Sequence, residues 1–418
     1  MPSGETHTSI VFDDGLADLA PLTDLRPAFD VRVAAFRNIE RLRMGLRLDV
    51  AAVWVPEPLA EITADRHAVP INAMPDHPKG PVLLVNGRCP IPDPDMARLE
   101  VGHAMIDPQS EHLIAARLEH GDARRVLEEG WAAHASRFEK RTAESVHLLT
   151  KPWQFRAARD EALEMDLRTM LRRKGRDIPR GVTVLGDPAH VVIDRNAEVR
   201  PGVVLDAESG PVVISTGAEV RPGAILVGPL AIGPGSTVRE NAVIRGGSAI
   251  GPTCKVGGEL GGVVFQGFAN KAHDGYLGDA WVGEWVNLGA ATTASNLLNT
   301  YGDIPCQQHP GEPRERTGEM YLGPMLGDHA KTAIGTRLMT GSIIHTGAMI
   351  ARSAPIAGSM PRFAWATDRD EIDPSAPQPR YELDRFLDVA RTVMSRREQE
   401  PTAAYMHRLA ALHEAEQA

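Results

Sequence analysis

The most regular pattern in the sequence is an aliphatic residue at every sixth position between Ile214 and Val256. The eight positions of this series are all valine, isoleucine or leucine: Ile214, Val220, Leu226, Ile232, Val238, Ile244, Ile250 and Val256. Between them lie many Gly, Pro, Asn and Ser residues. A period of six matches neither the 3.6-residue repeat of an α-helix nor the two-residue repeat of a lone strand. It predicts a β-helix, in which each short strand points one aliphatic side chain inward and small residues turn the corner.

The same spacing continues on both sides of this series. It is interrupted by an insertion at 206–211, by the glycine-rich segment 257–262, and by a predicted loop at 296–320. Further members of the pattern are Ile193, Val199, Leu205, Val282, Leu288, Leu338, Ile344, Ile350 and Ile356. At three hexads per coil, parallel strands about 4.8 Å apart would stack these side chains in columns.

The segment before the hexads has the pattern of an α/β domain. Apolar runs at 9–12, 50–55 and 82–85 predict buried strands, and residues 34–44 predict a helix. The segment 110–174 is predicted to be helical, because Leu113, Ala116 and Leu118 fall at helix-like offsets. The run 82–85 leads into Asn86-Gly87-Arg88, a position that faces the ligand crevice in open α/β sheets.

These patterns predict three parts of the chain. Residues 1–178 form an α/β domain, residues 179–365 form the β-helix, and residues 366–418 form a helical tail. The tail is apolar along one helical face, at Leu383, Phe386, Leu387, Ala390, Val393 and Met394. We therefore expect it to pack back on the β-helix or on a neighbouring subunit.

Composition narrows the class of partner. The net charge of −10 over 418 residues argues against a nucleic acid or an anionic membrane as the main partner. The three cysteines have no metal-ligand spacing and form no even disulfide set, and no stretch of ~18 apolar residues exists. We expect a cytoplasmic protein.

The segment 270–290 is the most polar part of the predicted β-helix. His273, Tyr276 and several amides lie where a coil needs aliphatic and small residues, so the packing of the coil does not explain their presence. From spacing alone, His273 and Tyr276 can be ordinary surface residues on a loop. The histidines at 273, 309, 329 and 345 have no ligand spacing, and no metal site is predicted from them.

The sequence Lys-Ala-His-Asp-Gly-Tyr-Leu-Gly-Asp-Ala at 271–280, followed by Val-Asn-Leu-Gly-Ala at 286–290, resembles a known acetyltransferase motif. The motif belongs to the bifunctional enzymes that combine N-acetylglucosamine-1-phosphate uridylyltransferase with glucosamine-1-phosphate acetyltransferase. The resemblance covers residues 215–360 well and the N-terminal half loosely, as in a divergent bacterial subgroup of sugar nucleotidyltransferase-like proteins. It implies a left-handed β-helix, a nucleotidyltransferase-like N-terminal domain and a homotrimer.

The resemblance also implies a role for each matching residue. His273 would be the general base that takes a proton from the substrate amine as the amine attacks the thioester of acetyl-CoA. Four residues would hold the sugar phosphate: Arg239, Glu259, Tyr276 and Asn287. Three would lie beside acetyl-CoA: Ala290, Asn296 and Thr336. The implied activity is acetyl transfer to an amino sugar phosphate such as glucosamine-1-phosphate, in the biosynthesis of UDP-N-acetylglucosamine.

This sequence departs from the family pattern in both halves. Gly261 replaces a phosphate-binding Lys, Leu297 replaces an aromatic residue, and residues 297–317 are inserted. In the N-terminal half, Asp13-Asp14-Gly15 replaces a glycine-rich loop, and Arg88 replaces a metal-binding Asp. Because Mg²⁺ requires oxygen ligands, we expect uridylyl transfer from a nucleoside triphosphate to be weak or absent. Mg²⁺ would be a cofactor only if this domain is active, and a purely architectural or binding role is the alternative.

Two other functions remain open at this stage. One is an acyltransferase that acts on a nucleotide-linked sugar or a hydroxyl group. The other is a non-catalytic trimeric scaffold in which both sites have decayed. The intact set of His273, Tyr276 and Asn287 argues against decay, whereas Gly261 and Arg88 argue for it.

Overall fold

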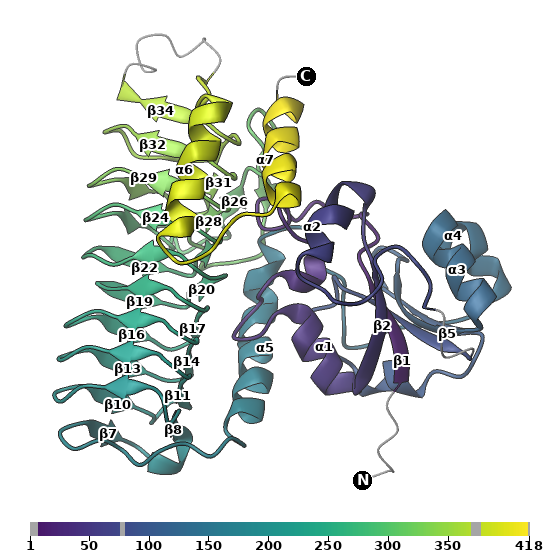
Figure 1. Ribbon diagram of the computed structural model, residues 1–418, viewed down its shortest axis with the longest axis horizontal. Helices are drawn as coiled ribbons and strands as arrows, with labels where there is room; N and C mark the ends of the chain where they lie inside the picture. Colours follow the sequence, from purple (N-terminus) through teal and green to yellow (C-terminus); the bar gives the residue numbers. More distant parts are fainter. Residues whose placement is uncertain (1–6, 76–79, 369–377, 417–418) are drawn as a thin grey trace.

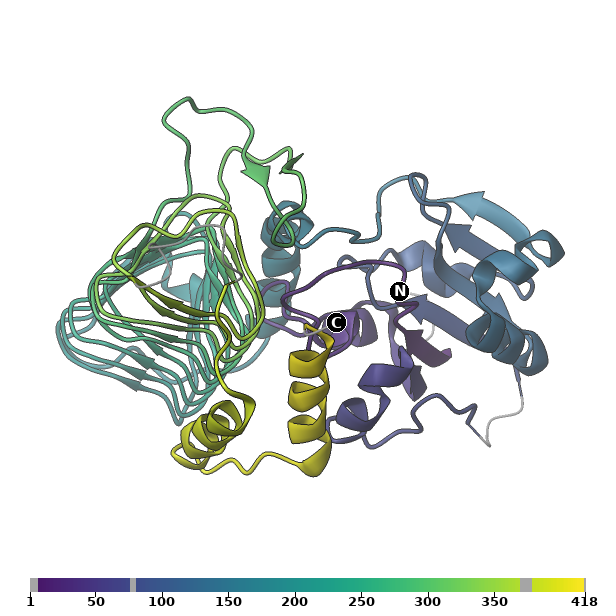
Figure 2. The same ribbon diagram turned by 90° about the horizontal axis from the view of Figure 1, so that it is seen from above.

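The computed structural model describes residues 7–75, 80–368 and 378–416. An α/β domain stands beside a tall stack of short strands; the last helix of the chain lies between the stack and the domain, and the helix before it lies against another side of the stack (Figures 1 and 2). Among the described residues, no helix has both the length and the apolar character that a membrane span requires.

The N-terminal domain is built on a mixed six-stranded sheet with the order β2-β1-β3-β5-β4-β6. Its strands are β1 (His7–Phe12), β2 (Leu48–Trp54), β3 (Val82–Asn86), β4 (His103–Ile106), β5 (Leu113–Leu118) and β6 (Glu139–Thr142). Strand β1 runs parallel to β2 and β3, whereas β5 runs antiparallel to β3 and β4. The three strands predicted from apolar runs are therefore confirmed as β1, β2 and β3.

The helices of this domain lie around the sheet. They are α1 (Asn38–Leu46), α2 (Ala60–Ala64), α3 (His120–Glu129), α4 (Trp131–His134) and α5 (Gln154–Met170), with 3₁₀ turns at Ala28–Asp30, Glu57–Leu59, Pro94–Arg98 and Ala135–Arg137. The prediction of a helix around Leu113, Ala116 and Leu118 was wrong, because these residues form β5. Strand β5 is buried almost throughout, so its apolar residues do not alternate and cannot be told from a buried helix by spacing.

The remainder of the chain winds through three parallel sheets, and from β7 to β21 each strand pairs with the strand three further along. The first sheet holds β7 (Thr183–Leu185), β10 (Val204–Asp206), β13 (Ile225–Val227), β16 (Val243–Arg245), β19 (Glu259–Gly261) and β22 (Tyr276–Gly278). The second holds β8 (Val191–Ile193), β11 (Val212–Ile214), β14 (Leu230–Ile232), β17 (Ser248–Ile250), β20 (Val264–Phe265), β23 (Trp281–Val282), β28 (Met325–Leu326), β31 (Ile343–Ile344) and β33 (Ser359–Met360). The third holds β9 (Glu198–Val199), β12 (Glu219–Val220), β15 (Thr237–Val238), β18 (Lys255–Val256), β21 (Asn270–Lys271), β24 (Asn287–Leu288), β29 (Lys331–Thr332), β32 (Met349–Ala351) and β34 (Trp365–Thr367).

This connectivity is that of a parallel β-helix, and its triangular cross-section is visible in Figure 2. The hexad side chains stack as their spacing predicts: Ile214 pairs with Ile232 and Ile232 with Ile250, one coil at a time. The eight residues of the central series are all buried at the centre of the coils. Each coil contributes only a few aliphatic side chains, and stacking turns them into one continuous core.

Two further pairs of strands lie near the predicted insertion. Strands β25 (Thr293–Ala294) and β30 (Arg337–Leu338) pair in parallel, and β26 (Pro305–Cys306) and β27 (Glu315–Arg316) form an antiparallel hairpin within the inserted segment. The hairpin reaches the N-terminal domain, where Gln308 donates to the carbonyl of Asp18 at 2.8 Å and Lys151 pairs with Glu315 at 2.7 Å.

Helices join the two halves of the molecule. Helix α5 packs its apolar face on outward residues of the second sheet, including Val213, Ala231 and Ala249. The tail forms α6 (Leu383–Ser395) and α7 (Ala403–Ala415). Phe386 of α6 contacts Phe363 edge-on at 4.9 Å, so the predicted tail helix packs back on the β-helix of its own chain.

Candidate functional site

His273 lies on a corner of the β-helix, in the turn between β21 and β22. The turn opens into a cavity of about 320 Å³ lined by Arg239, Glu240, Gly258, Ala272, His273, Asp274, Ala290 and Ala291. Three of the predicted site residues, Arg239, His273 and Ala290, are thus brought to one place from three of four successive coils, those of β15, β21 and β24. Within the described residues, the exposed imidazole of His273 has no hydrogen-bond or ionic partner, so it is available to a ligand.

The turn of His273 is held from inside the coil by Lys271, to which the sequence pattern gave no role. The Lys271 side chain is 1% exposed and stands in the inward column above Val256. Its ammonium donates to the backbone carbonyls of His273, Asp274 (3.2 Å) and Gly257 (3.4 Å). Burial lowers the pKa of Lys271 to about 8. Three donors thus meet three carbonyls, which satisfies the charge in an apolar interior.

Glu259 and Tyr276 are neighbours on the outward face of the first sheet. The phenol of Tyr276 lies over Gly278, where an added Cβ would stand 2.2 Å from its hydroxyl. Asn296 lies at the same place and donates to Asp279 at 2.8 Å. Burial, with Asp279 and Glu259 nearby, raises the pKa of Tyr276. Tyr276 therefore points away from the corner cavity and toward Asn296.

The side chain of Arg245 lies beside Gly261, the position where the family that the motif resembles has a phosphate-binding Lys. Arg245 pairs with Gly261 across the ladder, and an added Cβ on Gly261 would touch the Arg245 side chain at 3.5 Å. The Nε of Arg245 donates to Glu259 at 2.8 Å. A positively charged side chain of the neighbouring coil therefore lies next to position 261.

The remaining predicted residues lie outside the corner cavity. Asn287 is exposed on the third sheet and accepts from Asn270 at 3.2 Å, and Asn270 in turn accepts from Arg397 beyond the end of α6. Thr336 is buried one coil beyond Ala290, and its hydroxyl donates to the carbonyl of Ala333 at 2.9 Å. A single chain therefore assembles one part of the predicted set around His273 and leaves the rest on adjoining faces.

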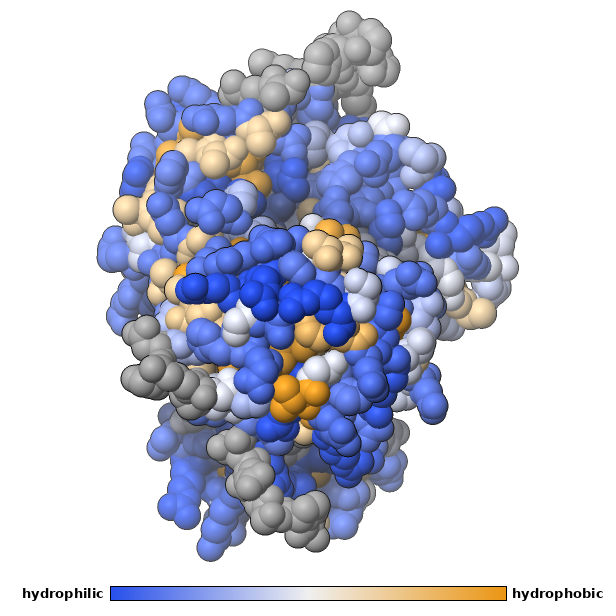
Figure 3. All heavy atoms as spheres, turned by 90° about the vertical axis from the view of Figure 1, so that its right-hand side faces the viewer, coloured by the Kyte–Doolittle hydropathy of each residue, from blue (hydrophilic) through white to orange (hydrophobic). Residues whose placement is uncertain are grey.

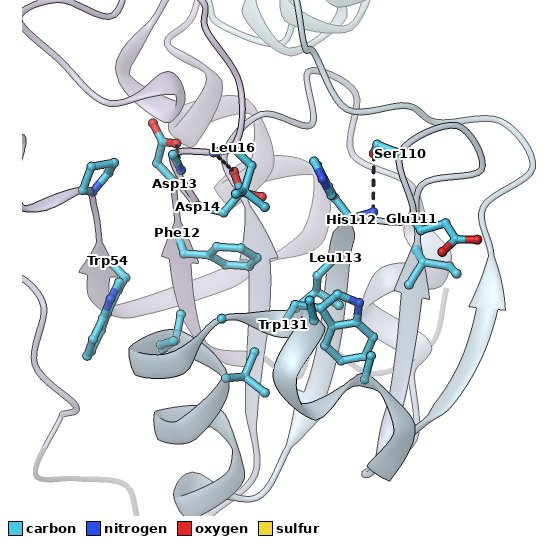
Figure 4. Close-up of a pocket in the computed structure, with 18 of the residues that line it drawn as sticks. Phe12, Asp13, Asp14, Leu16, Trp54, Ser110, Glu111, His112, Leu113 and Trp131 are labelled. Atoms are coloured by element: carbon cyan, nitrogen blue, oxygen red, sulfur yellow. Dashed lines mark hydrogen bonds between the residues drawn. The ribbon is translucent and has the colours of Figure 1, made fainter.

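The N-terminal domain has a larger pocket, of about 930 Å³, at the ends of β1 and β5 and beside α3 and α4. Its walls are largely aromatic and aliphatic, with Phe12 and Trp131 on facing sides and Trp54 at one margin (Figure 4). Figure 3 shows hydrophobic residues gathered at the centre of the face that this domain presents, surrounded by hydrophilic ones. Leu16 in the pocket lining is 60% exposed.

Two aspartates at the end of β1 border this pocket, and both are fully engaged. Asp14 forms a double hydrogen bond with Arg88, from Nε at 2.8 Å and from Nη2 at 2.7 Å. Asp13 accepts from the backbone amides of Gly15 at 3.1 Å and Ala28 at 2.7 Å. Burial raises the pKa of Asp13. The structure places Arg88 beside this loop and pairs it with Asp14.

The comparison with protein families identifies the class of the N-terminal half. The sequence model of the sugar nucleotidyl transferase family matches residues 9–174, which is the segment that carries the mixed sheet and α5. None of the curated proteins matches the chain. The chain thus contains a nucleotidyltransferase-like domain joined to a stack of parallel strands. The domain supports a general role in nucleotide-sugar biosynthesis.

Proposed function

We propose that the protein is an acetyl-CoA-dependent acetyltransferase that acts on an amino sugar phosphate, with His273 as the general base. The observation that carries this proposal is the corner cavity, in which an unpartnered imidazole, a guanidinium and a wall of small residues meet. The nucleotidyltransferase-like domain supports a role in nucleotide-sugar biosynthesis. The β-helix in this proposal is left-handed, as in the enzymes that the motif resembles.

The chemistry required of this cavity is simple. The amine nitrogen attacks the carbonyl carbon of the thioester, so that an N–C bond forms and the C–S bond breaks. His273 accepts the proton that the amine loses and returns it to the departing thiolate of the coenzyme. Arg239 offers a guanidinium for the phosphate, and Ala290 leaves room for the coenzyme arm along the corner.

The assembly proposed for this activity is a homotrimer. Tyr276 and Asn287 lie on faces that adjoin the corner rather than in the cavity, so the cavity of one chain lacks part of the predicted substrate set. A neighbouring copy packed against these faces would complete it, and cyclic symmetry would create three equivalent sites. Mixing His273→Ala chains with Asn287→Ala chains tests this arrangement. Mixed trimers regain part of the lost activity if the two residues of one site come from different chains, whereas a fully active monomer would contradict it.

The activity itself is tested by release of free thiol from acetyl-CoA. The acceptors are glucosamine-1-phosphate, glucosamine-6-phosphate, unphosphorylated glucosamine and UDP-glucosamine. We expect the sugar phosphates to be acetylated, and glucosamine to react much more slowly because it offers Arg239 no anion. Transfer to UDP-glucosamine alone would replace the proposed substrate with a nucleotide-linked sugar. No transfer to any amine would reject the proposal.

A further inference from the structure

The loop after β1 uses its own carboxylates to occupy backbone amides that could otherwise receive a phosphate. Asp13 Oδ1 accepts from the amide of Gly15, and Asp14 Oδ1 accepts from the amide of Leu16 at 3.1 Å. In loops that bind nucleotide phosphates, such amides point at the ligand and cradle its negative charge. Here the carboxylates of Asp13 and Asp14 already accept the hydrogen bonds that a phosphate would accept. A phosphate would meet carboxylates rather than free N–H groups.

The same loop does not fit a magnesium ion. Mg²⁺ needs oxygen ligands at about 2.0–2.1 Å in octahedral geometry. The two Asp14 oxygens face the guanidinium of Arg88, which is 1% exposed and is also fixed by a bond to the carbonyl of Leu149 at 3.0 Å. A divalent cation at Asp14 would meet this positive charge. Among the described residues, no cluster of three potential metal ligands was found.

The rest of the pocket suits a neutral ring. Phe12, Trp54 and Trp131 provide aromatic surface for stacking. Arg88 Nη2 lies 3.0 Å from His112 Nδ1, and because an arginine only donates, this nitrogen must accept. The His112 ring is therefore neutral and carries its proton on Nε2, which leaves one donor for a ligand. The volume of about 930 Å³ is in the range of sites that enclose small organic molecules.

The charges of the pocket wall also favour an uncharged ligand. The ionisable side chains of the lining are Asp13, Asp14, Glu111, His112 and Lys140. With Asp14 balanced by Arg88 and His112 neutral, Lys140 is a single cation against two carboxylates. A nucleoside triphosphate carries several negative charges and would be repelled.

We propose that this pocket binds an uncharged ligand of the nucleoside class without any metal ion, and that Arg88 stands as the fixed counter-ion of Asp14 where a magnesium ion would otherwise lie. The nucleoside class follows from the aromatic walls within a domain that matches sugar nucleotidyl transferases. We propose a ligand without a phosphate because Asp13 and Asp14 already occupy the backbone amides of the loop after β1. The site is separate from the corner cavity, so its test does not depend on acyl transfer.

The first experiment follows tryptophan fluorescence during titration of the full-length protein. The ligands are the common ribonucleosides and thymidine, each compared with its 5′-triphosphate, with and without MgCl₂. We expect saturable binding of at least one nucleoside, at least ~10-fold weaker binding of its triphosphate, and no effect of Mg²⁺. Magnesium-dependent, tighter binding of the triphosphate would overturn the proposal, and so would a panel in which no nucleoside binds.

Variants assign the signal to this pocket. Trp131→Phe should abolish most of the fluorescence change, whereas Trp365→Phe, which alters a half-exposed tryptophan of the β-helix, should leave it intact. Retention of the full change in Trp131→Phe, with its loss in Trp365→Phe, would move the binding site away from the N-terminal domain and reject the proposal.

The second experiment tests the role of Arg88 with Mn²⁺, whose free ion is counted by its electron paramagnetic resonance signal. Wild-type protein should leave Mn²⁺ free. Arg88→Met should bind it through the released Asp14, and the double variant Asp14→Asn with Arg88→Met should again leave it free while still binding the nucleoside. If Arg88→Met does not fold, wild type and the double variant still decide. Mn²⁺ binding to wild type that Asp14→Asn removes would overturn the proposal.

Discussion

The corner cavity and the N-terminal pocket use charge in opposite ways. In the corner cavity, His273 is exposed and has no partner among the described residues, and the buried charge of Lys271 lies beneath its turn. In the N-terminal pocket, Asp13 and Asp14 are bound by backbone amides and by a buried arginine. The imidazole of His273 is therefore available to a ligand, whereas the carboxylates of Asp13 and Asp14 are engaged in contacts that stabilise the fold.

This difference follows from the two scaffolds. A β-helix buries one aliphatic side chain per short strand, so its turns can carry polar groups in water without cost to the core. The end of a sheet in an α/β domain is partly buried, and every charge there must find a partner. Substitutions in the corner cavity should therefore change reaction rates, and substitutions at Arg88 should change stability.

The largest effect is expected for His273→Ala. Loss of a general base costs ~10²–10⁴ in rate, and the fold should be unaffected because the side chain is exposed. The measurement is thiol release together with thermal unfolding. His190→Ala, on another exposed turn of the β-helix, is the matched control and should keep full activity. More than a tenth of the activity left in His273→Ala would remove this residue from the role of base.

Arg88→Met should instead lower the free energy of unfolding by about 3–5 kcal/mol, because it leaves Asp14 without its partner in a partly buried site. The double variant Asp14→Asn with Arg88→Met removes both charges and should recover most of this loss. Urea unfolding of the three proteins measures the difference. Equal stability of wild type and Arg88→Met would show that the pair is not structural.

Lys271→Met should change the reaction rate, as His273→Ala does, but it alters a buried side chain, as Arg88→Met does. Methionine fills the inward column at similar volume, so stability should change little, but the carbonyls of the His273 turn lose their donors. A small displacement of a catalytic group can cost up to ~10²-fold in rate, and we expect kcat to fall by about 10–100-fold with little change in KM. Lys331→Met, two coils further along the same sheet, is the control because, among the described residues, Lys331 donates to the carbonyl of His329 and not to the turn of His273. Equal losses in both variants would deny Lys271 a specific positioning role.

The smallest expected effect is a pH dependence at Lys331. Burial lowers its pKa from 10.5 to about 8, so between these values the unfolded chain binds more protons than the folded chain. Its contribution is therefore fully present above pH 10.5 and is lost as the pH falls through 8. Wild type should gain on the order of 1 kcal/mol relative to Lys331→Met between pH 8 and 10. Urea unfolding across this range measures it, and a constant difference would contradict the shift.

The sequence predicts the β-helix well because its signal is local and repeated. Every sixth residue must be aliphatic, and Ile214, Ile232 and Ile250 meet one another in space as that rule requires. The strand β5 was missed because a strand buried on both faces loses its alternation. Only its pairing with the antiparallel strands β3 and β4 distinguishes it from a helix.

The site could be predicted only in part, for a similar reason. His273, Arg239 and Ala290 share a cavity because the coil repeat sets their spacing. The direction of the Tyr276 side chain depends on the absence of a side chain at Gly278 beneath it. The spacing of apolar residues along the chain does not predict this direction. Lys271 could have been noticed as a charged residue aligned with the aliphatic column, but its carbonyl partners depend on the path of the turn.

The inserted hairpin between β25 and β28 has an evolutionary consequence. After the insertion the chain resumes its place in the stack, and β23 pairs with β28 in regular register. The arm meanwhile reaches across to the N-terminal domain, where His309 lies 2.5 Å from Asp18. A repeating coil therefore lets a lineage add or remove such an arm in one event, without any compensating change in the coils on either side. New contacts between the two halves can be acquired in this way while the coils that carry the corner site keep their register.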